Sequence, residues 1–489
     1  MSYASVNTAV GFLKHLQVSI QQEPRLRDYE AWWTSQGDAI SESIDRAGTP
    51  WLRMFDQWGQ RIDEILYPPE YWTMLKRGYR AGAVWSCFED KSPLSSYLIG
   101  YVTAFHDPGL YCPYTVSLST AIPLSKYGTP ELRARFLEPM LRRDDSAWQG
   151  ATWMTEAKGG SDLGANVETT ARPIGDRWLL TGEKYFASNA GAELAVVAAR
   201  PETAPPGVRG LALFLLPKYK SDGTLNYYIR RMKNKIGTRS VPTGEVELKG
   251  SEAFLLGKAE WGIYLILEVL NLSRVANSVG SVALTQRAIS EAWTFASQRV
   301  AFGRTISDHP LLKKQFEDRW AGLKLAFALA WESVQLLDEV WQEIPPLSDR
   351  HHLFRLVTHL AKYWTAEFAA QTAKWEMEVH GGMGTLAEYS AERWFREAMI
   401  LAVWEGPAHR QILDGLEVMQ RKHAHRLLWK HLEKWAEGRE LKEIQEHVEQ
   451  YLALEPARQE ADAEILFRHL ARFAGQCLLK KYESGEGSI

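Results

Sequence analysis

Cysteine is scarce in this chain of 489 residues, which contains only Cys87, Cys112 and Cys477. Three thiols so far apart in the sequence match no disulfide framework and no metal-binding or redox spacing. Free, buried thiols in a reducing cytoplasm are therefore expected. His352 and His359 lie seven positions apart on a predicted helix without a third ligand, so the pattern predicts no metal site.

Long uncharged apolar runs are also missing. The stretch 323–341 is among the most apolar, yet it contains Lys324, Glu332 and Asp338, so no segment is expected to span a bilayer. The N-terminus lacks a basic region followed by a long apolar region, which argues against a signal peptide. The formal net charge is only −3, so the chain as a whole has no attraction to nucleic acids or anionic membranes.

The glycine-rich motifs of common nucleotide-binding folds are absent as well. The run 381–384 is rich in glycine but follows a predicted helix rather than a strand, so it is not a Rossmann fingerprint, and no P-loop occurs. What the chain does contain is 20 tryptophans, spread over its whole length. We interpret them as core and interface residues of a protein long enough for two or three domains.

The spacing of apolar residues divides the chain into four parts. Residues 1–150 show three- and four-residue spacing and are predicted to be a helical domain. Short alternating runs fill 151–258 and predict a small β-barrel or β-sandwich domain. Helical spacing returns over 259–420 in four long segments, as in a four-helix bundle. Extra amphipathic helices follow over 421–489, and the tail from Glu483 is predicted to be disordered. The predicted fold class is therefore multidomain α+β.

Glu405 ends an apolar run that begins at Met399, and it is followed at once by Gly406 and Pro407. Gly and Pro together stop any helix that precedes them. A carboxylate in apolar surroundings loses hydration, so its pKa rises toward the range where it exchanges protons near neutral pH. From this stretch alone, Glu405 is more readily interpreted as an exposed residue at a helix C-terminus than as a catalytic base.

Six separated motifs along residues 70–420 change this balance. They are Met-Thr-Glu and Gly-Ser-Asp within 154–162, the hairpin sequence at 180–189, Ile-Gly-Thr-Arg-Ser at 236–240, Ser-Arg and Gly within 273–280, Gln-Arg-Val-Ala-Phe-Gly at 298–303, and the closing signature at 380–406. Their residue types and their order resemble the acyl-CoA dehydrogenase superfamily of flavoproteins. Details of these motifs and the extra C-terminal helices resemble its AidB-like branch, which is associated with the adaptive response to alkylating agents.

The resemblance implies FAD as the cofactor and α,β-dehydrogenation of an acyl-CoA or related thioester as the reaction. Glu405 matches the base that removes the α-proton while a hydride leaves the β-carbon for flavin N5. The cofactor-binding residues that it implies are Met154, Thr155, Ser161, Phe186, Ser188, Arg299, Phe302, Glu378, Gly381, Gly382, Pro407 and His409. The implied substrate-binding residues are Ser161, Asn271, Arg274 and Gly406.

The resemblance also implies partners. Arg299 and Phe302 match flavin contacts that are often made across a subunit interface, so a homo-oligomer, either a tetramer or a dimer, is expected. Electron-transfer flavoprotein is the expected external acceptor. Pro407 and His409 depart from the family pattern, which has Thr or Ser and then Gln or Asn. Because proline has neither an N–H nor a hydroxyl, one flavin hydrogen bond is expected to be missing.

Two other functions stay open. A flavin oxidase or monooxygenase on the same fold would differ by rapid reoxidation of the reduced protein in air. A DNA-associated protein, as the AidB-like resemblance suggests, would need basic helices after the bundle. Residues 421–489 contain twelve Lys and Arg against twelve Asp and Glu, so DNA binding is not favoured.

Overall fold

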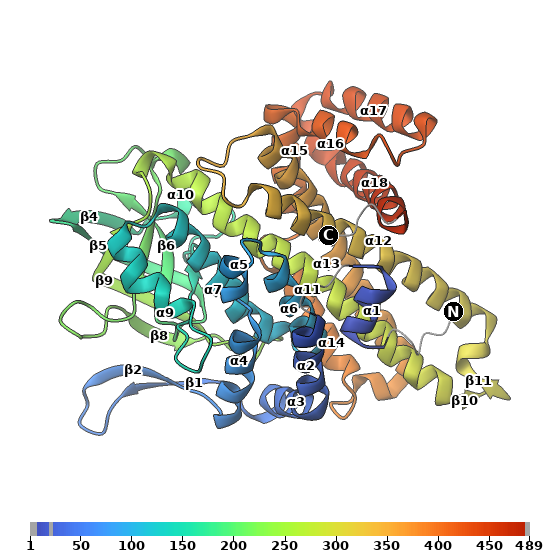
Figure 1. The fold of residues 1–489 in the computed structure, drawn as a ribbon, viewed down its shortest axis with the longest axis horizontal. Helices are drawn as coiled ribbons and strands as arrows, with labels where there is room; N and C mark the ends of the chain where they lie inside the picture. The colour runs from blue at the N-terminus through green and yellow to red at the C-terminus, as the bar shows by residue number, and fades with distance from the viewer. Residues whose placement is uncertain (1–6, 19–22, 485–489) are drawn as a thin grey trace.

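The computed structural model describes residues 7–18 and 23–484 of the chain. The chain starts in a group of helices, continues into a β domain at one end of the molecule, and returns through a bundle of long helices (Figure 1). A last group of helices packs against one side of this bundle. The predicted fold class is therefore confirmed. None of the described helices is long and apolar enough to cross a membrane.

Helices make up most of the N-terminal part, as the apolar spacing predicts. They are α1 (Ala9–His15), α2 (Glu23–Trp32), α3 (Asp38–Ala47), α4 (Pro69–Ala81), α5 (Trp85–Glu89), α6 (Leu94–His106) and α7 (Pro108–Tyr127). Asp107 starts α7, because its carboxylate accepts the Leu110 N–H at 2.8 Å. Pro108 then supplies the backbone φ of the first helical position. Further along, Thr129 caps α8 (Pro130–Leu132) in the same way.

The apolar spacing does not predict one element of this part, a hairpin of β1 (Trp51–Phe55) and β2 (Arg61–Leu66). Asp56 closes its turn, because its carboxylate accepts the N–H groups of Trp58 and Gln60 at 2.8 and 2.9 Å. Neither strand has a fully buried face, so the alternation that identifies a strand in a sequence is weak here. The hairpin lies beside β8 (Tyr228–Met232) of the β domain.

Seven strands form the β domain. In addition to β8 they are β3 (Thr152–Trp153), β4 (Thr170–Ile174), β5 (Arg177–Ser188), β6 (Leu194–Pro201), β7 (Ala212–Pro217) and β9 (Thr243–Leu255). Their order is β3-β6-β4-β5-β9-β7, and a further pairing of β6 with β7 closes five of them into a small barrel. The strand β8 pairs with β9 outside this ring. It is not predicted by the sequence pattern, because most of its residues are polar or partly exposed.

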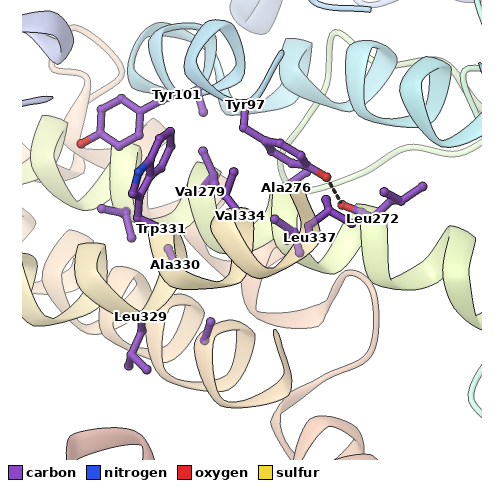
Figure 2. Packing of buried hydrophobic residues seen from close by; sticks show 14 of the residues in the cluster. Tyr97, Tyr101, Leu272, Ala276, Val279, Leu329, Ala330, Trp331, Val334 and Leu337 are labelled. Carbon is purple, nitrogen blue, oxygen red and sulfur yellow. Dashed lines mark hydrogen bonds between the residues drawn. The ribbon is translucent and has the colours of Figure 1, made fainter. Parts of the chain in front are cut away.

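The bundle consists of α11 (Gly262–Gln298), α12 (Pro310–Val340), α13 (Asp349–His380) and α14 (Ala391–Val403). The helix α11 is central, because it packs on α6 and α7 on one side and on the three other bundle helices on the other. Figure 2 shows Tyr97 and Tyr101 of α6 above α11, and Trp331 and Val334 of α12 in the same apolar cluster. The Tyr97 hydroxyl donates to the Leu272 carbonyl at 3.0 Å, so even this apolar contact satisfies its polar group.

After the bundle, α15 (Ala408–Lys422) leads into the C-terminal extension, which contains α16 (Ala424–Leu432), α17 (Gly438–Leu452) and α18 (Pro456–Glu483). One buried carboxylate fastens it to the bundle. Glu332 of α12 accepts from His431 Nε2 of α16 at 2.6 Å and from Lys481 Nζ of α18 at 2.7 Å. Glu483, where the predicted disordered tail begins, belongs instead to α18. Residues 485–489 of that prediction lie outside the described residues.

Candidate active site between the β domain and the helical bundle

Glu405 lies in a short turn between the end of α14 and the start of α15. Its φ of +57° is in the left-handed region, and Gly406 follows with a φ of +96°. A residue with a side chain costs roughly 1–3 kcal/mol in such a conformation, and it persists only where its surroundings fix it. Such residues occur often at active sites, so the backbone itself marks this turn as a candidate site.

Three side chains from three helices hold this turn by its carbonyl groups. Arg274 of α11 donates through Nε to the Glu405 carbonyl at 3.2 Å. Gln411 of α15 donates through Nε2 to the same carbonyl at 2.8 Å. Lys362 of α13 donates through Nζ to the Gly406 carbonyl at 2.8 Å. The left-handed turn is therefore fixed by tertiary contacts rather than by its own sequence.

Burial raises the pKa of Glu405 to about 7, because a carboxylate removed from water loses hydration. The positive charges of Arg274 and Lys362 act in the opposite direction and limit this rise. A carboxylate with such a pKa is ionised in about half of the molecules near neutral pH, which suits a general base. The raised pKa expected from the apolar run is therefore present.

Arg274 and Asn271 are directed into the protein. Arg274 is only 5% exposed, and its Nη2 lies 3.0 Å from Oδ2 of Asp414 on α15. Its Nη1 donates to Asn271 Oδ1 at 3.2 Å, one helical turn earlier. The described contacts of Arg274 are therefore with the backbone of the Glu405 turn, with Asp414 and with Asn271.

The loop 154–162 begins directly after β3, at the front of the barrel. Met154 is buried, and the Thr155 carbonyl accepts the Tyr185 N–H of β5 at 2.9 Å. Gly160 is required for the close fold of this loop, because a Cβ there would lie 2.7 Å from the Thr155 hydroxyl oxygen. Ser161 is exposed and follows at once. The loop thus presents hydroxyl groups near the edge of β5.

A buried ion pair fastens this loop to the barrel. Lys184 Nζ of β5 lies 2.6 Å from Glu156 Oε1, and neither side chain reaches solvent to more than a few per cent. Glu156 also accepts from the Thr169 hydroxyl at 2.6 Å, and Lys184 also donates to the Ala198 carbonyl at 2.7 Å. Both residues lie inside motifs visible in the sequence, but nothing in the spacing showed that they pair.

Phe186 and Ser188 lie two positions apart on β5 and so face the same side of the strand. The Phe186 side chain is 53% exposed, which is unusual for a large aromatic residue. The Ser188 hydroxyl lies 3.2 Å from the Thr243 hydroxyl of the paired strand β9. The Phe186 ring contacts the Tyr185 ring, 5.2 Å away between centroids, and Lys233 Nζ, 4.9 Å from its centroid. An exposed ring on the same strand as a hydroxyl pair is suited to a planar, polar ligand.

A cleft of ≈ 500 Å³ opens next to these strands, between the β1–β2 hairpin, β8 and residues 233–242. This volume is in the usual range of small-molecule sites. Val241 on its wall packs with Cys112 and Val116, and Trp404 lies against the same cluster. One wall residue of the cleft therefore shares an apolar cluster with the residue that precedes Glu405.

Lys235 lies at the inner end of the cleft and was not singled out from the sequence. Its Nζ donates to the Thr238 carbonyl at 2.7 Å and to the Thr243 hydroxyl at 3.1 Å. Burial lowers its pKa to about 8. Cys112 is also buried there, as expected for all three cysteines, which are free. Within the described residues, no group of His, Cys, Asp and Glu side chains could hold a metal ion.

The other predicted flavin contacts lie at the opposite end of α11. Arg299 caps this helix, and Phe302 forms the turn between β10 (Val300–Ala301) and β11 (Arg304–Thr305) with 94% of its side chain exposed. Gly381 and Gly382 lie nearby, because the ring of the preceding His380 is 4.3 Å from that of Phe295 on α11. Glu378, at the end of α13, is exposed and pairs with Lys374.

One protomer does not bring these two groups of residues together. Between Arg274 and its C-terminal end, α11 runs for roughly 36 Å at 1.5 Å per residue. Figure 1 shows β10 and β11 at the end of the molecule opposite the β domain. Pro407, at the start of α15, and His409, exposed in its first turn, stay on the Glu405 side.

A second buried glutamate, which the sequence analysis did not assign to the site, lies on α14. Burial raises the pKa of Glu397 to about 7 as well. Its carboxylate accepts the Thr238 N–H at 2.7 Å and so fastens the 236–241 loop to the bundle. A raised pKa therefore does not by itself identify the base. The distinguishing features are that Glu397 is fully buried and bound to the Thr238 N–H, whereas Glu405 is partly exposed in a left-handed turn.

Three family models match consecutive parts of the chain. Residues 11–145 match the adaptive response protein AidB N-terminal domain. Residues 151–251 match the acyl-CoA dehydrogenase middle domain, and residues 260–419 match the acyl-CoA dehydrogenase C-terminal domain.

Individual relatives agree with these matches. Acyl-CoA dehydrogenase family member 11 of Caenorhabditis elegans is 30% identical over 79% of this chain, which spans 66% of that protein. The putative acyl-CoA dehydrogenase AidB of Escherichia coli (strain K12) is 28% identical over 76% of this chain and 70% of its own length. The crystal structure of Caenorhabditis elegans ACDH-11 in complex with C11-CoA matches with a TM-score of 0.85 and 25% identity, covering 100% of this chain and 88% of that one.

Proposed function

Since this chain belongs to the acyl-CoA dehydrogenase family, in its AidB-like branch, we propose that it is an FAD-dependent oxidoreductase that dehydrogenates an acyl thioester. The observation that carries this proposal is the left-handed turn of Glu405, which three helices hold by its carbonyls and whose carboxylate has a pKa raised to about 7. Glu405 would remove the α-proton of the thioester and hold it on its carboxylate. Arg274, Gln411 and Lys362 keep the base in place by holding its backbone.

The residues on β5 and in the loop 154–162 fit an isoalloxazine ring. The exposed ring of Phe186 and the hydroxyl of Ser188 offer an apolar surface and a polar contact on one face of β5. Thr155 and Met154 come from the adjacent loop, and Lys235 provides a half-buried amine. Bound FAD supplies the acceptor for the hydride that leaves the β-carbon. The distance between this group and Arg299 supports a homo-oligomer in which a second copy completes the site.

The substrate proposal is an acyl-CoA, with electron-transfer flavoprotein as the external acceptor. The C11-CoA complex of the nematode relative supports a thioester of medium chain length as the first to test. DNA binding is not part of the proposal, because most basic residues of the extension are paired with acids. Such pairs are Arg426 with Glu449, Arg439 with Glu443, Arg458 with Asp462, Arg468 with Glu464, and Lys481 with Glu332.

The absorbance spectrum of the purified protein tests this proposal directly. A flavin spectrum that bleaches anaerobically on addition of a saturated acyl-CoA would support it. The acyl-CoAs tested should differ in acyl-chain length. The free acids and the amines with the same carbon chains should be tested beside them. A protein that carries no flavin after reconstitution with FAD, or that bleaches only with non-thioester compounds, would contradict it. Rapid reoxidation of the bleached protein by air would instead favour an oxidase.

The proposed base makes the reaction dependent on pH in a defined direction. Glu405 accepts a proton only when it is ionised, and its pKa is about 7. The kcat/KM is therefore expected to fall about tenfold for each pH unit below 7 and to level off above it. Initial rates from pH 5 to 9 measure this profile. An unshifted rate down to pH 5 would exclude a base with this pKa.

The variant Phe302→Ser tests whether a second copy of the chain contributes to the flavin site. The Phe302 side chain is 94% exposed, so Phe302→Ser is expected to change the free energy of unfolding by less than about 0.5 kcal/mol. If this ring contacts the flavin of another protomer, the same change weakens FAD binding at least tenfold, as measured by flavin absorbance titration and light scattering. Leu311→Ser is the control, because Leu311 is also exposed (74%) but lies outside the flavin motifs. Equal FAD affinity in both variants would remove Phe302 from the site.

A further inference from the structure

Lys362 is a buried lysine that holds the Glu405 turn from both sides. It lies near the middle of α13 and is only 1% exposed. Its Nζ donates to the carbonyl of Ala402, in the last turn of α14, at 3.0 Å. It also donates to the carbonyl of Gly406, directly after Glu405, at 2.8 Å. One ammonium thus closes the segment 402–406 around the glutamate.

The Ala402 carbonyl needs such a donor, and the Gly406 carbonyl accepts from both Lys362 and Gln411. Carbonyls in the last turn of a helix have no partner within the helix. A buried carbonyl without a partner is costly, and a lysine ammonium has three N–H groups to offer. Gln411 holds Glu405 and Gly406 from the opposite element, α15, and its own Oε1 lies 2.9 Å from His359 Nδ1. His359 is one turn before Lys362 on α13, so α13 supports the turn both directly and through Gln411.

Three charged side chains act on the pKa of Lys362, which burial also shifts. Burial lowers the pKa of Lys362 to about 7, Glu405 favours its charged form, Arg274 of α11 disfavours it, and Glu367 of α13 favours it. Burial lowers the pKa of His359 to about 3, so this imidazole is neutral near pH 7. The carboxylate of Asp414 is occupied by Arg274 and Arg410. The thiol of Cys112 is neutral too, because burial raises its pKa to about 12.

We propose that Lys362 is a positioning residue for the reaction proposed above: its ammonium fixes the 402–406 turn and, as a buried cation beside Glu405, keeps that carboxylate ionised so that it can accept the α-proton. The proposal rests on the proposed function. Lys362 contacts the backbone of the turn rather than a reacting atom, so its effect passes through Glu405. Because the two groups influence each other, they titrate as a pair. Removing the cation raises the pH at which Glu405 becomes an effective base.

Lys362→Met tests this role, because it keeps the length of the side chain and removes the charge. The acidic limb of the kcat/KM profile is expected to move up by at least one pH unit, so that kcat/KM at pH 7 falls at least about fivefold and recovers toward pH 9. Lys362→Arg, which keeps the charge, is expected to keep the wild-type limb. Lys314→Met, at an exposed lysine of α12, is the control for loss of a positive charge elsewhere in the bundle. If the methionine variant does not fold, Lys362→Gln, which keeps a donor without a charge, replaces it.

Exchange of the thioester α-protons with D2O, measured by NMR with the flavin chemically reduced, separates this inference from the proposed function. This exchange needs the base but no hydride transfer. If the wild-type protein exchanges no α-protons, the proposed function fails. If the wild-type protein does exchange α-protons, the pH dependence of the exchange in Lys362→Met decides the inference. An acidic limb at the wild-type pH, or an equal loss of exchange at every pH, would mean that Lys362 has only a structural role. In that case this inference fails while the proposed function stands. An equal upward shift in Lys362→Arg would also overturn the inference.

Discussion

Glu405→Gln is expected to lower turnover by about 10²–10⁴-fold, the usual contribution of a general base, while FAD stays bound. Glutamine has nearly the same shape, and the contacts that hold residue 405 go to its backbone carbonyl, which the substitution leaves in place. An amide cannot accept the α-proton near neutral pH. The measurements are steady-state rates with an acyl-CoA and the flavin content of the purified variant.

Glu397→Gln is the matched control for this experiment. Glu397 is the same residue type and also has a pKa raised to about 7, although it is fully buried while Glu405 is partly exposed. Glutamine keeps the oxygen that accepts the Thr238 N–H, so turnover is expected to stay within about threefold of the wild type. If Glu397→Gln loses turnover and Glu405→Gln retains it, the base has been assigned to the wrong glutamate, and the proposed mechanism is wrong.

Lys184→Met is expected to destabilise the protein by about 3–5 kcal/mol, because it leaves the buried carboxylate of Glu156 without its cation. The loop 154–162, which Glu156 fastens to the barrel, would lose its fixed position. Flavin content should therefore fall together with stability. Urea-induced unfolding and flavin absorbance measure the two effects on the same sample.

The control for this substitution lies on the same loop. Lys158 pairs with Glu168, but both side chains are more than 60% exposed to solvent. An exposed pair is screened by solvent and contributes little, so Lys158→Met is expected to leave stability and flavin content nearly unchanged. Similar losses in the two variants would show that the pairing of Lys184 with Glu156 is not what holds the loop.

Local patterns predicted much of the fold. The helices around Val275 and Leu323 follow three- and four-residue apolar spacing, because each buries one or more faces in the bundle. The barrel strands were recognisable from alternation and turn residues. The hairpin that includes Trp51, and the strand β8 beside it, were not predicted, because both are partly exposed and have little alternation.

The sequence by itself determined that this chain has a helix-barrel-bundle order, and that Glu405 ends an apolar run before Gly406 and Pro407, because such patterns depend on neighbours in the chain. Only the tertiary structure decided that Arg274, Lys362 and Gln411 meet at this turn and that its backbone is left-handed. These residues are up to about 130 positions apart, and no local spacing encodes which helices converge. The same holds for Arg299 and Phe302, which the fold separates from Ser188 by the length of α11.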